Sequence, residues 1–213
     1  MAYDLEEQEQ LAELKAWWKD YGGIVLLVLI AAAVTAAGWR GWQWYQNNQA
    51  VQAGAQYAAL VKAGQAGDAK AVKETSGALL ENYPRTLYAS MGALVAARVL
   101  FDAGDLKNAK AQLEWVVAKS RSAEVRDTAR LRLASVLLDE KAYAEALKAL
   151  EGEHAESFES QYAAMRGDIL LASGRRAEAG SAYRAALDNA KKNNTSQTAF
   201  HESVRMRLDA VGG

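Results

Sequence analysis

The most distinctive pattern along the chain is a single uncharged apolar run from Tyr21 to Trp39 (YGGIVLLVLIAAAVTAAGW). A helix rises about 1.5 Å per residue, so this run spans about 28 Å, close to the hydrocarbon thickness of a bilayer. The pattern therefore predicts one membrane-spanning helix. It divides the chain into a tail (residues 1–20), an anchor segment (residues 21–45) and a larger body (residues 46–213).

Aromatic residues flank this run on both sides and bear on three interpretations of it. They are Trp17, Trp18, Tyr21, Trp39, Trp42, Trp44 and Tyr45. Indole and phenol rings prefer the membrane–water interface, so this double belt favours a retained membrane anchor over a buried core helix. A cleavable signal peptide would have a basic start and a shorter apolar core, although Ala31 and Ala33 leave a cleavage site open.

The basic residues around the run indicate its direction across the membrane. Lys15 and Lys19 lie just before it and Arg40 lies just after it, with no further Lys or Arg until Lys62. Lysine and arginine near a span favour the cytoplasmic side, so two residues against one predict a cytoplasmic N-terminus. The body would then face the periplasm of a bacterial envelope.

Small residues recur along the anchor segment. Ala33, Ala37 and Gly41 stand four residues apart, a spacing at which another membrane helix can approach closely. These three residues are our candidate contact with a neighbouring membrane helix. The alternative is that alanine is a filler that membrane helices tolerate.

The tail before the anchor is acidic and amphipathic. It carries six acidic side chains against two lysines. Leu11, Leu14 and Trp18 follow an i, i+3, i+7 spacing, which predicts a lead-in helix with one apolar face. Such a helix could lie on the bilayer surface, but its acidic face argues against binding to anionic lipid.

From about residue 47 the pattern changes to a repeat of small and large positions. Ala66–Lys70 (AGDAK) is echoed by Ala103–Lys107 (AGDLK), thirty-seven residues later. Two antiparallel helices can cross closely only where one presents a small side chain, and large residues fill the space around the crossing. The small positions are Ala97, Ala134, Gly167, Ala109, Ala146 and Ala179, and the large ones are Leu100, Leu137, Leu170, Leu113, Leu150 and Tyr183.

Spacings of 37 and 33 residues are typical of helix–turn–helix repeats. Gly67, Gly104 and Gly174 fall at the expected turns, where a positive φ often closes a helix, and Pro84 ends the first pair. We predict four helix pairs, at about residues 47–84, 87–120, 123–153 and 156–190. A capping helix is predicted at 195–211, with Phe200, Val204, Met206 and Leu208 facing the last pair. An unrelated helical bundle is the alternative.

Composition agrees with an all-α fold and narrows the function. The chain has only one proline, which suits an almost wholly helical fold. It has no cysteine, and this absence excludes a disulfide framework, a thiolate metal site and a thiol nucleophile. Its 25 basic and 26 acidic residues give a formal net charge of −1. Because there is no basic stripe interleaved with aromatic residues, nucleic acid is not an expected partner.

Residue patterns that carry chemistry are missing from the sequence. His154 and His201 are the only histidines, and no H-E-x-x-H, G-x-S-x-G, phosphate-binding or dinucleotide-binding motif occurs. Acidic pairs such as Asp139–Glu140 fall at expected helix ends, where solvation explains them better than acid–base catalysis. We predict that the protein is not an enzyme and uses no cofactor, metal or small-molecule substrate.

Protein binding is the remaining class of function. Stacked helix pairs form a concave surface that binds extended peptides or partner helices. By their position in the repeat, the first helices of the second to fourth pairs present a candidate groove, whose alternative role is ordinary solvation of exposed helix faces. The candidate residues are Arg98, Asp102, Arg132, Ser135, Asp139, Gln161 and Asp168.

The repeat resembles the tetratricopeptide repeat, which has small, large and small contact positions and a glycine-containing turn. Together with Glu13–Lys19 (ELKAWWK), the single span and Gly38–Trp42 (GWRGW), it makes the chain resemble the YfgM family of ancillary subunits of the SecYEG translocon. The resemblance covers essentially the whole chain and is most specific in residues 1–45.

This resemblance implies an inner-membrane anchor, a cytoplasmic N-terminus and a periplasmic repeat domain. It also implies three partners: the SecYEG translocon, a membrane-anchored periplasmic chaperone of the PpiD type, and client polypeptides that are assisted as they emerge. Because repeat folds serve many tasks, a scaffold for another envelope complex, in cell-wall synthesis or respiratory-complex assembly, is the alternative function.

Overall fold

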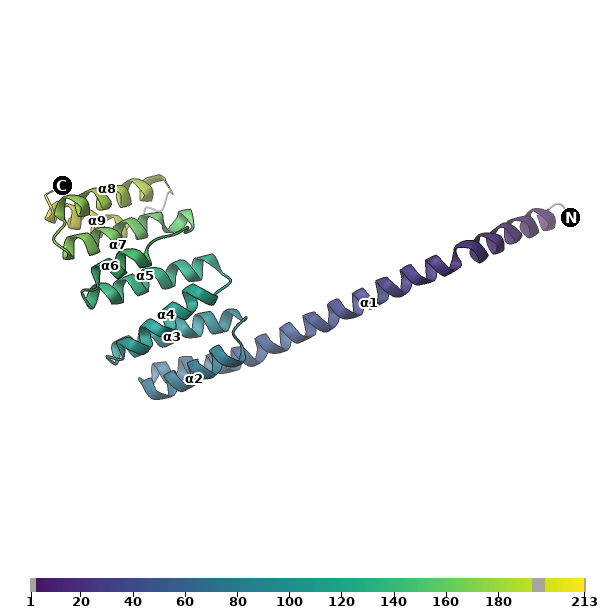
Figure 1. Cartoon of the computed structure of the whole chain (residues 1–213), viewed down its shortest axis with the longest axis horizontal. Helices are drawn as coiled ribbons and strands as arrows, with labels where there is room; N and C mark the ends of the chain where they lie inside the picture. The colour runs from purple at the N-terminus through teal and green to yellow at the C-terminus, as the bar shows by residue number, and fades with distance from the viewer. Residues whose placement is uncertain (1–2, 193–197, 213) are drawn as a thin grey trace. The chain divides into compact units, whose positions relative to one another are not determined.

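The structure is a computed structural model that describes residues 3–192 and 198–212, and all regular elements in these ranges are helices (Figure 1). They are α1 (Tyr3–Gln65), α2 (Ala69–Asn82), α3 (Leu87–Asp102), α4 (Leu106–Lys119), α5 (Ala123–Asp139), α6 (Tyr143–Ala149), the 3-10 helix η1 (Glu156–Phe158), α7 (Glu159–Ala172), α8 (Arg176–Lys192) and α9 (Thr198–Ala210). The chain divides into an N-terminal unit, residues 1–49, and a repeat unit, residues 50–213.

The N-terminal unit consists of the first part of α1, whose large apolar side chains are exposed. From Glu9 onward α1 is long and apolar enough to cross a membrane, and only 6% of its most apolar window is buried. Leu27 and Trp39, for example, expose 68% and 65% of their surfaces. Burying such side chains in a bilayer would be favourable, so this surface fits the predicted anchor.

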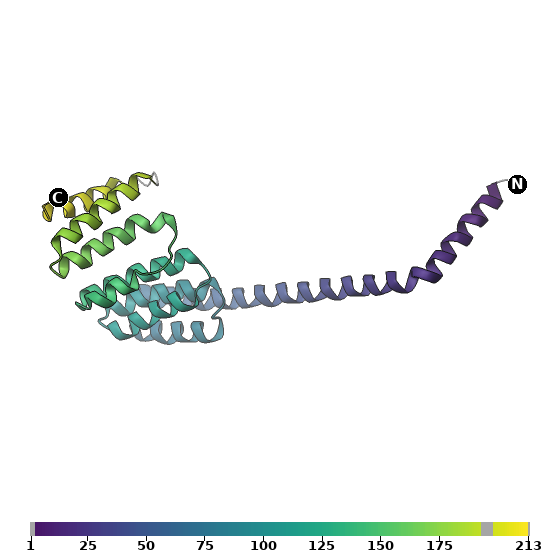
Figure 2. The ribbon, with the colours of Figure 1, turned by 45° about the horizontal axis from the view of Figure 1, so that its top comes forward.

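The repeat unit is a stack of helix pairs in chain order (Figures 1 and 2). The last part of α1 packs with α2, α3 pairs with α4, α5 with α6, and α7 with α8, while α9 packs on α8. The first helices of successive pairs also touch, because α3 contacts α5 and α5 contacts α7. The prediction of a tetratricopeptide-like α-solenoid of four pairs plus a capping helix is therefore confirmed.

The predicted small positions lie where helices cross. Ala97, Ala109 and Ala134 are all buried, and each packs in an apolar cluster shared by neighbouring helices. Two crossings are equally tight: a Cβ placed on Gly167 of α7 would lie 2.5 Å from Cε1 of Tyr183, and one placed on Gly92 of α3 would lie 2.5 Å from Cδ2 of Leu79. Only glycine lets the Tyr183 ring lie so close to the α7 backbone.

The apolar core is a series of clusters, each shared by successive pairs. In one cluster, Leu113 of α4 packs with residues of both α3 and α5. In another, Leu150, which directly follows α6, packs with residues of α5 and α7. Each pair therefore depends on its neighbours for burial, which is the property that defines a repeat array.

The turns inside the pairs share one backbone geometry. Gly67, Gly104 and Gly174 have φ of 70°, 80° and 82°, as the sequence predicts for helix-closing glycines. The turn between α5 and α6 has the same register and Lys141 in the same place, with φ of 63°. A lysine in this left-handed region costs more than a glycine, so the third turn is the strained one.

The capping helix α9 packs one apolar face against the preceding pair. Val204 is fully buried in a cluster with α7 and α8, and Phe200, Leu208 and Val211 pack against it. The prediction for Met206 is wrong, because its side chain is 66% exposed. Met206 is two residues from Val204, about 200° around a helix, and therefore faces away from the stack. Residues 195–197 of the predicted cap lie outside the described residues.

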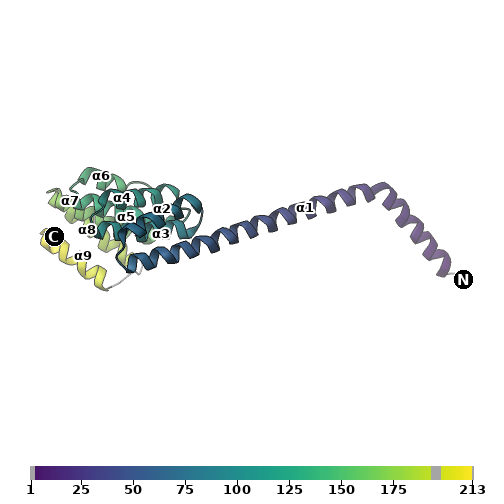
Figure 3. The ribbon, with the colours of Figure 1, turned by 90° about the horizontal axis from the view of Figure 1, so that it is seen from below.

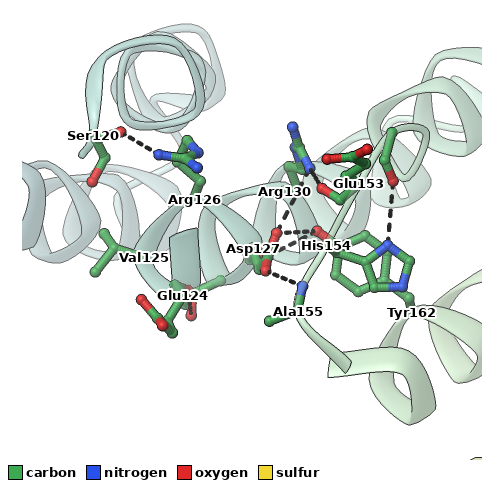
Figure 4. A network of polar contacts seen from close by, with 12 residues as sticks. Ser120, Glu124, Val125, Arg126, Asp127, Arg130, Glu153, His154, Ala155 and Tyr162 are labelled. Atoms are coloured by element: carbon green, nitrogen blue, oxygen red, sulfur yellow. Dashed lines mark hydrogen bonds and ion pairs between the residues drawn. The ribbon is translucent and has the colours of Figure 1, made fainter. Parts of the chain in front are cut away.

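The third pair differs from the others because its second helix, α6, has only seven residues. A loop follows it and is tied to α5 by a polar network (Figure 4). The carboxylate of Asp127, which is 2% exposed, accepts hydrogen bonds from the Ala155 amide at 3.0 Å and the Tyr162 hydroxyl at 3.2 Å. These bonds give a backbone amide of the loop and the buried Tyr162 hydroxyl a hydrogen-bond partner.

Arg130 and His154 add further contacts to this network. Arg130 Nη1 lies 3.6 Å from the Asp127 carboxylate and donates to the Glu153 carbonyl at 2.7 Å. The imidazole of His154 stacks on the Tyr162 ring, with centroids 4.0 Å apart and planes 3° apart. Burial, together with the nearby Asp127 carboxylate, raises the pKa of Tyr162 to about 12, so its phenol stays neutral as a donor.

Candidate protein-binding surface

The predicted groove residues of α3 form one exposed pair. Arg98 and Asp102 stand one helical turn apart, and Nε of Arg98 lies 2.7 Å from the Asp102 carboxylate. Their side chains are 74% and 52% exposed. An ion pair this exposed adds little to stability, so both groups remain accessible to a partner.

A pocket opens beside this pair, between α3 and α5. It has a volume of about 320 Å³. Its lining consists of Ala97, Arg98, Phe101, Leu113, Arg132, Ser135 and Val136. The structure thus brings together three of the predicted groove residues, Arg98, Arg132 and Ser135, around one cavity.

The two arginines of the pocket differ in their charge balance. The guanidinium of Arg98 is paired with Asp102, whereas Nη1 of Arg132 donates to the Leu94 carbonyl at 3.3 Å. Among the described residues no carboxylate forms an ion pair with Arg132. The pocket therefore has an apolar floor and an uncompensated positive charge at its rim, which suits an apolar side chain next to a carboxylate.

Sequence reasoning missed the apolar part of this surface. Phe101 lines the pocket, and Leu87 and Met91, nearer the start of α3, are 57% and 38% exposed. Successive spacings of four, three and seven residues separate Leu87, Met91, Leu94 and Phe101 along α3. These side chains therefore lie on one helix face. This periodicity is visible in the sequence and is the signal that marks the apolar part of the surface.

The remaining predicted groove residues lie away from the pocket lining. Asp139 is exposed at the end of α5, and Gln161 is half-buried near the start of α7. The carboxylate of Asp168 is already engaged, because it accepts from Tyr183 Oη at 2.8 Å and from Arg207 Nη1 at 2.7 Å. Asp168 therefore joins α7 to α8 and α9.

Burial governs the protonation of this junction. It raises the pKa of Asp168, although the hydrogen bond from Tyr183 and the charge of Arg207 act in the opposite direction. It also raises the pKa of Tyr183, together with the hydrogen bond to Asp168. Because the Asp168 carboxylate is already bonded to Tyr183 and Arg207, Asp168 is not part of the candidate binding surface.

The predicted membrane-helix contact lies in the N-terminal unit. Ala33, Ala37 and Gly41 are exposed along α1, and a Cβ placed on Gly41 would meet nothing within 4 Å. Their spacing places them on one side of the helix. The face is open, and its use as a helix contact stays a prediction.

The described residues contain no group of three or more His, Asp or Glu side chains that could hold a metal ion. The arrangement at the α3–α5 pocket offers apolar contact, one uncompensated cation and a serine hydroxyl. These groups can bind a polypeptide segment.

Comparison with known proteins agrees with the fold and also indicates the family. A family model described as a tetratricopeptide repeat-like domain matches residues 15–213. A Haemophilus influenzae protein named ancillary SecYEG translocon subunit is 31% identical over 186 residues, covering 87% of this chain and 91% of that protein. The protein of the same name from Neisseria gonorrhoeae is 31% identical over 215 residues, covering 99% and 100%. The Escherichia coli protein of that name is 27% identical, covering 85% and 87%.

The helix pairs, the capping helix and the apolar N-terminal helix define a tetratricopeptide-like repeat protein with a candidate membrane anchor. Similarity along nearly the full length then narrows this class to one family. The chain belongs to the family of ancillary SecYEG translocon subunits, the YfgM family.

Proposed function

We propose that this protein is a membrane-anchored, non-enzymatic adaptor of the SecYEG translocon. The observation that carries the proposal is the identity of 31% to proteins named ancillary SecYEG translocon subunit, over as much as 99% of the chain. The single apolar helix and the open pocket on the repeat unit support it. A PpiD-like periplasmic chaperone and emerging client polypeptides are the further partners in this proposal.

The proposed binding surface is the α3–α5 pocket together with the apolar stripe along α3. Phe101 and Met91 would contact apolar side chains of the partner, and Arg132 would meet a carboxylate. Contacts of this kind are weak when each partner diffuses freely. A membrane anchor raises the effective concentration of the surface near the translocon, so weak contacts suffice.

Photo-crosslinking in intact membranes tests this surface and its partners together. A photoreactive amino acid at Arg98 or Arg132 should give adducts with translocon subunits and a periplasmic chaperone. The matched control is Glu114, which is exposed on α4 and does not line the pocket. Adducts of equal strength from Glu114, or adducts dominated by another envelope complex, would refute the proposed surface or the proposed partner.

The proposed topology places residues 1–20 in the cytoplasm, residues 21–45 in the membrane and residues 46–213 in the periplasm. Because the chain has no cysteine, single substitutions give clean labelling sites. In spheroplasts, a membrane-impermeant maleimide should label Lys70→Cys and leave Glu13→Cys unlabelled. The reverse pattern would invert the topology.

The tethering role is tested by removing residues 1–45. The remaining chain should stay helical and soluble, because its apolar clusters lie in the repeat unit. It should no longer co-purify with translocon components. Undiminished co-purification of this shortened chain would show that the repeat unit alone finds the translocon.

A further inference from the structure

The segment of α1 before the apolar run has two chemically different faces. At about 100° per residue, an apolar face and an acidic face lie on opposite sides of the helix. The apolar face consists of Leu11, Leu14, Trp18 and Tyr21, and the acidic face of Glu9, Glu13 and Asp20. The four apolar side chains are between 52% and 59% exposed. We call residues 9–21 the amphipathic arm.

A bend in α1 accompanies this arm. Figure 3 shows the purple N-terminal part of α1 turning away from the direction of the following helix within the N-terminal unit. The only two adjacent glycines of α1 are Gly22 and Gly23, and sharp helix bends are typical of such pairs. The arm therefore does not continue the apolar run in a straight line.

The Trp18 indole packs on the first of these glycines. A Cβ placed on Gly22 would lie 3.0 Å from Trp18 Cε2, whereas one placed on Gly23 would meet nothing within 4 Å. Gly22 is also the only buried residue between Glu9 and Gln49. The two glycines thus differ, and Gly22 is the one whose missing side chain leaves room for the indole.

Geometry decides which environment the arm can reach. If α1 were straight, Leu11 would lie about 15 Å beyond Tyr21 along the helix axis, in water. A bent arm can instead lay its apolar face against the interface where the apolar run enters the membrane. Leu14, Lys15, Trp17 and Trp18 border an open hollow of about 460 Å³ on this segment.

We propose that the amphipathic arm lies along the membrane surface, with its apolar face in the lipid interface and its acidic face in water. The inference rests on the proposed membrane anchor, to which the arm is directly joined. Indole rings favour the interface, and the long stems of Lys15 and Lys19 can reach past it to water. The partner is the lipid surface itself.

The acidic face determines what drives this binding. Glu9, Glu13 and Asp20 would be repelled by anionic headgroups, so the attraction comes from burial of apolar surface. Insertion of the arm should therefore be deeper in zwitterionic than in anionic bilayers, and added salt should not weaken it. Most interfacial helices are basic, so they bind more strongly to anionic lipid and lose affinity as salt is added.

Spin labels on the full chain in lipid nanodiscs test the arm residue by residue. Single cysteines replace Leu11, Leu14, Glu13 and Asp20 in turn, and each label is exposed to oxygen and to a water-soluble nickel chelate. We expect the ratio of oxygen to nickel accessibility to be several-fold higher at Leu11 and Leu14 than at Glu13 and Asp20. Uniformly high nickel accessibility at all four positions would overturn the proposal.

A label at Val28, in the middle of the apolar run, separates this inference from the proposed anchor. If Val28 is shielded from nickel while Leu14 is accessible, the arm proposal fails and the anchor stands. If both positions are accessible to nickel, the anchor itself fails. Shielding at both positions, with Glu13 accessible, supports both proposals.

The two glycines provide a matched pair of variants. Gly22→Leu would place its side chain against the Trp18 ring and displace the ring, whereas Gly23→Leu adds the same side chain to open space. We expect Gly22→Leu to lower the oxygen-to-nickel ratio at Leu14 several-fold and Gly23→Leu to leave it unchanged. Equal ratios in the two variants would overturn the role given to the packing of Trp18 on Gly22.

Discussion

The second and third helix pairs share one apolar pattern but close their turns differently. Leu113 and Leu150 occupy the same register, and each is 1% exposed. In the second pair, Gly104 takes the left-handed position and Asp105 caps α4 by accepting from the Asn108 backbone N–H at 3.2 Å. The third pair has Lys141 and Ala142 in these places, with no side-chain cap for α6.

The third pair replaces these local devices with the network around Asp127. Asp127 is in register with Ser90 of the second pair and Ser160 of the fourth, and all three are buried. Of these three residues, only Asp127 is a carboxylate. It accepts a hydrogen bond from the backbone of the loop that follows the short α6. The spacing of apolar residues thus determines the repeat. A glycine turn and a helix cap can be replaced by polar contacts between residues far apart in the sequence.

The largest expected effect comes from removing this carboxylate. Asp127→Ala should lower the free energy of unfolding by about 4 kcal/mol, because it leaves the Ala155 amide and the Arg130 charge without their buried partner. Ser90→Ala, at the same register in the second pair, should cost no more than about 1 kcal/mol. Urea unfolding of the detergent-solubilised chain, followed by circular dichroism, measures both. Equal losses would erase the distinction between the pairs.

Truncation of the shared leucines tests what the two pairs have in common. Leu113→Ala and Leu150→Ala should each lower the free energy of unfolding by about 3 kcal/mol, since both side chains are fully buried at equivalent places. The same urea unfolding experiment applies. A much smaller loss for Leu150→Ala would mean that the polar network, and not the apolar cluster, holds the third pair.

Alkaline pH should weaken the network of the third pair. The fold favours the neutral phenol of Tyr162, whose pKa rises from 10.0 to about 12, so stability is constant below pH 10 and falls as the pH rises toward 12. The full loss is on the order of 2 kcal/mol. Tyr162→Phe should reduce the slope of unfolding free energy against pH over this range. Tyr183, whose pKa is also raised, supplies the slope that remains.

The smallest expected effect is an exchange of turn residues. Lys141→Gly should raise the free energy of unfolding by about 1 kcal/mol, because glycine adopts the left-handed conformation without a steric cost. Gly104→Lys should lower it by about the same amount. Thermal unfolding of the two variants compares them directly, and a gain for Gly104→Lys would contradict the steric explanation of the turns.

Most of the fold could be predicted from the sequence because its determinants are local and periodic. The register of Ala97 with Ala109 and of Gly167 with Tyr183 follows from spacing alone, and so do the glycine turns. The third turn was harder to recognise because Lys141 stands where the pattern has glycine. The prediction for Met206 fails because an apolar side chain faces the core only if its angular position on the helix also does.

The binding surface could be predicted only in part. Repeat position alone placed Arg98, Arg132 and Ser135 around one cavity, but it also selected Asp168, whose partners come from α8 and α9. A carboxylate on an exposed helix face and one locked between helices have the same sequence pattern. Only the distances to Tyr183 and Arg207 separate them.

The chain of apolar clusters also has a consequence for how the protein folds. Each cluster joins residues of adjacent helices, such as Ala93 to Val136 in one and Val72 to Ala109 in another, and needs no contact from the far end of the chain. Low separation between contacting residues favours rapid folding. A chain that emerges N-terminus first can therefore close each cluster as soon as the next helix appears, and only the last pair must wait for α9.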